Sequence, residues 1–297
     1  MKVEKIYFKA TDGLSLFGLL HTSENATQTI VLSVHGMQSN MFKEKDKIES
    51  EFLTQNNIDY FCFNNRGSEI YTKIKKQVGD KSFKVNCGSM WENIYECIYD
   101  LDAAINILIN RGYTNIILQG HSLGSIKSVI YYNYLINNNM FEKLNKIKTL
   151  VLLSLVNIQE FSYFNNLEST QKNIQLAKNL IVDNQEDAII VDALGFPSSA
   201  KTFLQYFNDD LNFPKFTDKE SSFNELNAIK CPLFMRYGND NELIALSANE
   251  VVNILKIKIN NKNIDIDYID GANHSFKGKE LLLTKQIFEF INRYVVN

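Results

Sequence analysis

The chain has 297 residues, of which 45% are hydrophobic, and its formal net charge is −3. This length allows one large domain or one domain with an inserted subdomain. The basic residues are spread along the chain rather than concentrated, which argues against nucleic acid as the main partner. The longest apolar run, Leu150–Val156, is far too short to span a bilayer, so we expect no membrane span.

The chain begins with two segments in which apolar residues alternate with polar ones. These are Val3–Lys9 and Leu14–His21, separated by Thr11-Asp12-Gly13. Alternation on either side of a DG turn predicts an antiparallel hairpin. The next segment, Thr29–Val34, has no polar face, which is typical of a parallel strand covered by helices on both sides.

Beyond residue 34, strands alternate with helices, which predicts a mostly parallel, doubly wound sheet of eight strands. The helix after Ser89 has the clearest pattern, because Ser89 and Glu92 have the spacing of a capping box and Gly112 follows as a stop. We expect strands at 60–63, 115–118, 149–154, 233–237 and 264–269, and helices at 41–56, 90–111, 123–137, 246–257 and 279–295.

One stretch interrupts this alternation. Roughly 75 residues separate the strand at 149–154 from the strand at 233–237, where a crossover needs only about a dozen. Helical patterns at 171–182, 186–194 and 198–207 indicate that this stretch has structure of its own. We therefore expect a helical cap insertion over residues 159–226, above a core formed by residues 1–158 and 227–297.

The strongest chemical signal is Gly120-His121-Ser122-Leu123-Gly124, which lies between a predicted buried strand and a predicted helix. This is the context that a G-x-S-x-G nucleophile turn requires. The turn is tight enough to strain the serine backbone, and the two glycines avoid clashes that larger residues would cause. Ser122 is therefore the candidate nucleophile.

With this motif the chain resembles the α/β-hydrolase superfamily, over most of its length. In that family the catalytic residues follow the order serine, acid, histidine along the chain. The resemblance therefore implies His274 as the base, because the other three histidines precede Ser122. The run Gly271-Ala272-Asn273-His274 after the last strand also looks like the family's histidine loop.

His35-Gly36 at the end of the third strand resembles the family's oxyanion loop. The resemblance implies that the backbone N–H groups of Met37 and Leu123 would stabilise the negative oxygen of the transition state. We expect His35 itself to be a structural hydrogen-bonding residue.

The acid is where the sequence departs from the family's pattern. The position at which the family usually has aspartate holds Asn241, with Asp240 and Glu242 on either side. Either carboxylate is a candidate, Asp240 in a tighter loop and Glu242 through its longer side chain. Asn241 and Glu160 are the remaining alternatives; an asparagine could orient the imidazole but could not neutralise its charge.

The remaining features are less specific. Four scattered cysteines without a CxxC pair predict free thiols in a reducing cytoplasm. The first residues carry charges and lack the apolar core of a secretion signal. Histidines and carboxylates do not occur at metal-ligand spacing, so we expect neither a metal nor another cofactor.

The function that follows is hydrolysis of a small-molecule carboxylic ester through an acyl-serine intermediate. The sequence does not separate an esterase from a thioesterase, an amidase or an acyltransferase in small-molecule biosynthesis, since pocket and cap set the leaving group. A hypothesis from another class is a non-catalytic hydrolase-fold binding protein or sensor. The unusual acid loop favours that hypothesis, and the intact serine turn and histidine loop oppose it.

Overall fold

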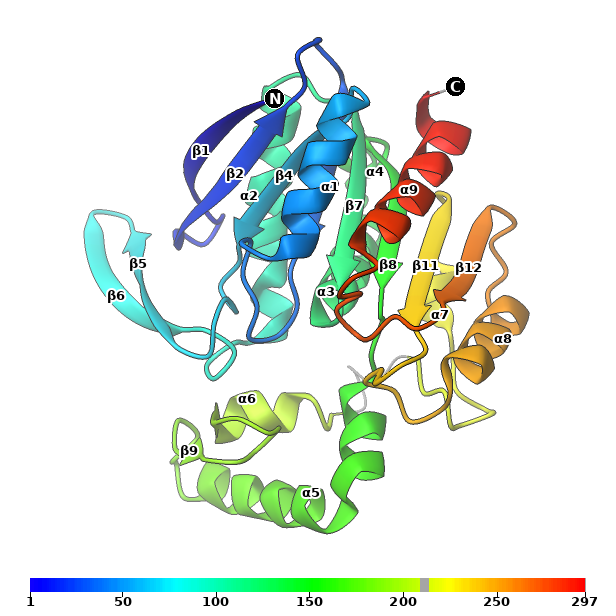
Figure 1. Cartoon of the computed structure of the whole chain (residues 1–297). Coiled ribbons are helices and arrows are strands. Elements are labelled where there is room, and N and C mark those ends of the chain that lie inside the picture. The colour runs from blue at the N-terminus through cyan, green and yellow to red at the C-terminus, as the bar shows by residue number, and fades with distance from the viewer. Residues whose placement is uncertain (209–213, 297) are drawn as a thin grey trace.

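The protein contains an eight-stranded sheet with helices on both faces (Figure 1). The structure is a computed structural model, and it describes residues 1–208 and 214–296. Residues 209–213, within the predicted insertion, lie outside the described residues. The strand order is β1-β2-β4-β3-β7-β8-β11-β12, and the strands are β1 Lys2–Lys9, β2 Ser15–Thr22, β3 Thr29–Val34, β4 Asp59–Asn64, β7 Asn115–His121, β8 Ile147–Leu153, β11 Leu233–Gly238 and β12 Ile264–Ile269.

The sheet is antiparallel only at the edge where the chain begins. β1 pairs with β2, and β2 pairs with β4, in antiparallel register, whereas the pairs from β4 to β12 are parallel. The predicted hairpin and all eight predicted strands are therefore confirmed. In a parallel sheet the carboxyl ends of the strands lie along one edge, so the loops after β3, β7, β8, β11 and β12 can converge there.

Two helical layers cover the sheet. One apolar cluster joins one face of the strands to α2 (Cys97–Asn110), α3 (Leu123–Asn137) and α8 (Ala248–Lys258). A second cluster joins the other face to α1 (Glu44–Gln55) and α9 (Glu280–Ile291), which continues into a π-helical turn at Asn292–Val296. The central strands are buried on both faces, as expected for strands without a polar side.

The predicted helix at 90–111 begins later than expected, and its capping box is wrong. A 3₁₀ turn, Ile94–Glu96, precedes α2, and Asn93 caps that turn. The Ser89 hydroxyl instead accepts a hydrogen bond from the Gln38 N–H and lies 3.0 Å from the Gly67 carbonyl oxygen. Glu92 forms a buried ion pair with Lys127. Both side chains of the predicted capping box thus bind residues that are distant in sequence, and the box does not form.

Much of the chain between β8 and β11 forms a separate group of elements beyond the carboxyl edge of the sheet (Figure 1). This group contains α5 Ile158–Val182, the short strands β9 Ile189–Ile190 and β10 Ser198–Ser199, and α6 Ala200–Gln205. The last helix of this stretch, α7 Asn224–Asn227, instead packs on the core, where Leu226 belongs to the same apolar cluster as α3. The helix predicted at 186–194 is wrong, because β9 pairs with β10 in this stretch. The helix predicted at 198–207 begins at Ala200, after β10.

A hairpin and a short helix were also not predicted. β5 (Thr72–Val78) and β6 (Lys81–Cys87) form an antiparallel hairpin that projects from the body of the protein (Figure 1). Its strands are largely exposed and rich in lysine, so they lack the apolar alternation that marks a half-buried strand. A short helix, α4 (Phe141–Leu144), precedes β8.

Candidate active site

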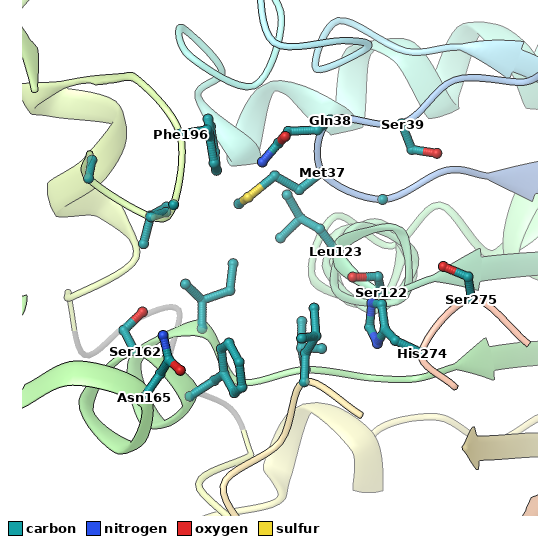
Figure 2. A pocket seen from close by; sticks show the side chains of 18 of the residues that line it. Met37, Gln38, Ser39, Ser122, Leu123, Ser162, Asn165, Phe196, His274 and Ser275 are labelled. Carbon is teal, nitrogen blue, oxygen red and sulfur yellow. The ribbon is translucent and has the colours of Figure 1, made fainter. Parts of the chain in front are cut away.

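A cavity of about 550 Å³ lies between the carboxyl edge of the sheet and the segment that contains α5. Ser122 and His274 both line this cavity, and Figure 2 shows their side chains next to each other at one end of it. A volume in this range is typical of pockets that enclose most of a small ligand. The predicted nucleophile and base therefore share a cavity large enough for a substrate.

Ser122 lies on a sharp turn between β7 and α3, and its backbone is strained. Its φ is 56° and its ψ is −124°, a conformation that costs a non-glycine residue free energy. A Cβ atom at Gly120 would lie 2.3 Å from the Gly124 carbonyl oxygen, and one at Gly124 would lie 2.1 Å from the Val34 carbonyl oxygen. Only glycine therefore fits at these two positions, as the sequence predicted.

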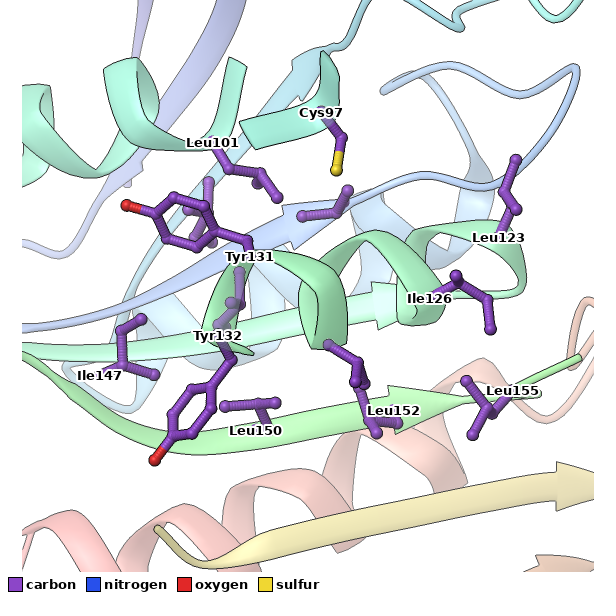
Figure 3. Close-up of a cluster of buried hydrophobic side chains, with 14 of the residues drawn as sticks. Cys97, Leu101, Leu123, Ile126, Tyr131, Tyr132, Ile147, Leu150, Leu152 and Leu155 are labelled. Carbon is purple, nitrogen blue, oxygen red and sulfur yellow. The ribbon is translucent and has the colours of Figure 1, made fainter. Parts of the chain in front are cut away.

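The packing of α3 holds this turn in place. Figure 3 shows side chains of α3, among them Leu123, Ile126 and Tyr132, packed with residues of β8 and α2. The N–H of Ser122 also donates a hydrogen bond to the Leu153 carbonyl oxygen, at the end of β8. The strained conformation persists because the surrounding core determines it.

The loop after β3 passes directly against the serine. A Cβ at Gly36 would lie 2.9 Å from the Ser122 Cβ, so this loop needs a glycine to come so close. Met37 and Leu123 both line the cavity. Leu123 is the first residue of α3, where a helix leaves its N–H groups without intrahelical partners.

His35 supports this loop from behind. Its Nε2 accepts a hydrogen bond from the Asn65 N–H, and the residue is buried. Burial, helped by the nearby Lys127 ammonium, lowers the pKa of His35 to about 3. A neutral, buried imidazole with a backbone partner fits a structural role better than a catalytic one.

The Glu242 side chain lies against His274, the predicted base. The Glu242 Oε1 and the His274 Nδ1 form a short hydrogen bond, and the Glu242 side chain is only 4% exposed. Burial by itself would raise the pKa of Glu242. The hydrogen bond and charge of His274, together with the Gly238 N–H and the Ser154 hydroxyl, outweigh burial and lower this pKa below its usual value.

The other candidate acids lie elsewhere. The Asp240 carboxylate accepts a hydrogen bond from the Asn241 amide rather than from an imidazole, and its backbone N–H donates to Ala272. Asn241 has a positive φ of 49°, which places the next residue, Glu242, toward the sheet. The Glu160 carboxylate accepts hydrogen bonds from the backbone N–H groups of residues 216 and 217.

Two further residues hold the pair in place, and sequence reasoning missed both. The Ser154 hydroxyl, at a residue with φ 46°, donates to Glu242 Oε2 at 2.8 Å. The His121 Nε2–H donates to the His274 carbonyl oxygen at 2.7 Å. Burial, together with the neighbouring His274, lowers the pKa of His121 to about 3. The only available signal was their position, since Ser154 directly follows β8 and His121 directly precedes Ser122.

Within residues 1–208 and 214–296, no three histidine, cysteine or acidic side chains gather in a way that could hold a metal ion. Over the same part of the chain, no helix is both long and apolar enough to cross a membrane. The four cysteines are free, and three of them are buried.

No protein-family model matches the chain, and no curated protein matches it. Solved structures do match it over nearly the whole length. The α/β hydrolase GrgF from Penicillium sp. sh18 has 12% sequence identity and a TM-score of 0.68, with all of both chains covered. Est1E from Butyrivibrio proteoclasticus, with ferulic acid bound, has 14% identity and a TM-score of 0.64, with 98% of this chain and 100% of the other covered.

A third match is an esterase from Pyrococcus furiosus, with 17% identity, a TM-score of 0.61, and 99% of this chain and 92% of the other covered. At such identities the likeness concerns the fold. The chain has the α/β-hydrolase fold, as the sequence predicted.

Proposed function

We propose that the protein is a serine hydrolase that cleaves a carboxylic ester through an acyl-serine intermediate. The observation that supports this most strongly is one arrangement: the strained Ser122 and the buried His274–Glu242 pair at one end of one cavity. A serine hydroxyl becomes nucleophilic when a base lies beside it and a third group orients that base.

In the proposed mechanism, His274 donates its Nδ1–H to Glu242 and therefore presents an unprotonated Nε2 to the serine. This nitrogen takes the Ser122 proton as the serine oxygen attacks the ester carbonyl. The N–H groups of Met37 and Leu123 stabilise the resulting oxyanion, worth about 3–4 kcal/mol per donor. The imidazolium then protonates the leaving alcohol, and water repeats the sequence to release the acid.

Glu242 has a defined part in this scheme. The imidazolium forms in a cleft with little water, where burial disfavours the charged ring unless a negative charge is close. A carboxylate on Nδ1 supplies that charge and fixes the tautomer. The low pKa of Glu242 supports this role, because it keeps the group ionised at neutral pH.

We further propose that residues 159–226 act as a cap over the core formed by residues 1–158 and 227–297. The support is that the cavity is lined from both sides: Gly36, Ser122 and His274 come from the core, and Ser162 and Phe196 come from the insertion. Four aromatic residues of the insertion lie outside the cavity lining: Phe203 and Tyr206 are buried, and Tyr163 and Phe207 contact each other.

A thioesterase or an acyltransferase would use the same groups, so these remain the alternatives within enzymes. The non-catalytic sensor is opposed by the buried carboxylate on His274, since a binding protein has no need to hold an imidazole in one tautomer.

A fluorophosphonate probe tests the proposal. We expect labelling at one site, loss of labelling in Ser122→Ala, and retention in Ser275→Ala, which removes another hydroxyl from the same cavity. Labelling that survived Ser122→Ala would refute the assignment, and a folded protein that was never labelled would favour the sensor. Matched p-nitrophenyl esters and acyl thioesters, with and without an alcohol acceptor, then distinguish esterase from thioesterase and acyltransferase.

A further inference from the structure

The helix that faces Ser122 across the cavity is broken. α5 has non-helical backbone angles at Asn166, with φ −158° and ψ 88°. The Asn166 side chain accepts a hydrogen bond from the Ser169 N–H, and the Thr170 hydroxyl donates to the Ser162 carbonyl oxygen. Side chains thus replace the missing helical hydrogen bonds, and the break is a stable feature of the fold.

The break concentrates polar side chains in the lining of the cavity. Asn165 and Asn166 line the cavity, and so do three hydroxyl residues of the same helix, Ser162, Ser169 and Thr170. Figure 2 shows Met37 and Leu123, together with Gln38 and Ser275, on the side of Ser122, whereas Ser162, Asn165 and Phe196 face the cavity from the other side. Both sides of the cavity therefore mix polar and apolar residues, with apolar side chains next to Ser122 and the polar side chains of α5 at a distance from it.

The polar wall is neutral, and part of it lacks protein partners. In the part of the chain that the structure describes, the Ser162 hydroxyl and the Asn165 side-chain amide make no hydrogen bond to the protein. Glu160, near the start of α5, turns away to bind the backbone at residues 216 and 217. Lys43 and Asp192 are the permanently charged side chains among the described lining residues, and both are exposed, as Asn165 is.

From this arrangement we propose that the substrate is an ester with a neutral hydroxyl or amide group at its far end and an apolar segment between that group and the scissile bond. The proposal rests on the proposed function and specifies its substrate. An apolar terminus would remove water from Ser162 and Asn165 without replacing its hydrogen bonds, which is unfavourable. A terminal hydroxyl or amide would replace them.

Matched esters test the proposal in two arms. In the first, p-nitrophenyl esters carry acyl chains of about four to ten carbons that end in methyl, hydroxyl or carboxylate. In the second, alkyl acetates are compared with monoacetates of diols of equal length, which places the polar group on the alcohol side. In one of the arms we expect the hydroxyl ester to exceed its methyl counterpart in kcat/KM by about fivefold, the equivalent of one hydrogen bond. The carboxylate ester should be slower than the hydroxyl ester.

Variants connect the preference to the wall. Asn165→Leu combined with Ser162→Ala should reverse the preference toward the methyl ester, whereas Asn179→Leu, on α5 but outside the cavity lining, should keep the wild-type ratio. If wild type hydrolyses p-nitrophenyl acetate through Ser122 but prefers the methyl esters in both arms, this inference fails and the proposed function stands. A hydroxyl preference that the double variant leaves unchanged also overturns it. If the folded protein hydrolyses no ester, both proposals fail.

Discussion

Replacing Glu242 with glutamine should nearly abolish turnover, because an amide cannot satisfy the partners that the carboxylate has now. Glu242 Oε1 faces His274 Nδ1, while Oε2 accepts hydrogen bonds from the Gly238 N–H at 2.9 Å and the Ser154 hydroxyl at 2.8 Å. If the amide oxygen faces His274, the NH₂ group meets the Gly238 N–H, and two donors oppose each other. If the NH₂ group faces His274, it holds the tautomer whose Nε2 is already protonated.

The expected size of the loss follows from both effects. The wrong tautomer and the uncompensated imidazolium cost about 10⁴ in turnover in serine proteases, or about 5.4 kcal/mol of transition-state stabilisation. We expect Glu242→Gln to lower kcat by about 10³–10⁴. KM should change little, since Glu242 does not belong to the cavity lining. Asp240→Asn, which alters the same loop without touching His274, should stay within about twofold of wild type.

The assay is hydrolysis of one activated ester, with folding checked by thermal melting for every variant. A Glu242→Gln variant that kept more than about one tenth of wild-type kcat would refute the assignment of the acid. A large loss in Asp240→Asn alone would return the acid to the neighbouring residue, and would mean that the loop rearranges when substrate binds.

The remaining predictions concern the catalytic unit, its support and stability. Ser122→Ala and His274→Ala should each lower kcat by several orders of magnitude, and the double variant should be no slower than either, since residues of one unit are not additive; a much slower double variant would contradict this. Ser154→Ala removes a hydrogen-bond donor from Glu242, so kcat should fall by about tenfold; an unchanged kcat would show that the hydroxyl only fills space. His35 and His121 both have a pKa lowered to about 3, mainly by burial, so below pH ~6.5 the unfolded chain binds protons that the folded protein excludes, and each histidine should lower the free energy of unfolding by about 1.4 kcal/mol per pH unit until about pH 3. Urea unfolding at pH 7 and 5 measures this, and His35→Gln should reduce the slope.

The eight strands were predictable because each shows an apolar or alternating pattern in its own residues. The absence of a capping box at Ser89 was not predictable. Its three-residue spacing is a local signal, whereas the residues that bind Ser89 and Glu92 instead are distant in sequence. The Ser89 hydroxyl binds Gln38, and Glu92 binds Lys127. The lysine-rich β5–β6 hairpin was missed for the opposite reason, since it buries too little to leave an apolar pattern.

The placement of Ser122 and His274 in one cavity was predictable because their surroundings are local: two glycines for the turn, and one histidine after the last strand. The choice between Asp240 and Glu242 was not, because it depends on backbone geometry. The positive φ of Asn241 and the hydrogen bond from the Asp240 N–H to Ala272 decide which carboxylate points inward. Neither can be read from residue identity alone, and the same is true of the contacts made by Ser154 and His121.

The insertion is bonded to the core through α6. The Gln205 side chain, at the end of α6, accepts a hydrogen bond from the Ile94 N–H and donates one to the Glu92 carbonyl oxygen. The Glu92 carboxylate in turn lies 2.5 Å from the ammonium group of Lys127 on α3, the helix that begins directly after Ser122. Ala177 of α5 packs against Phe203 of α6 in one buried cluster. A displacement of either helix of the insertion would therefore disturb contacts that lead to the helix behind Ser122.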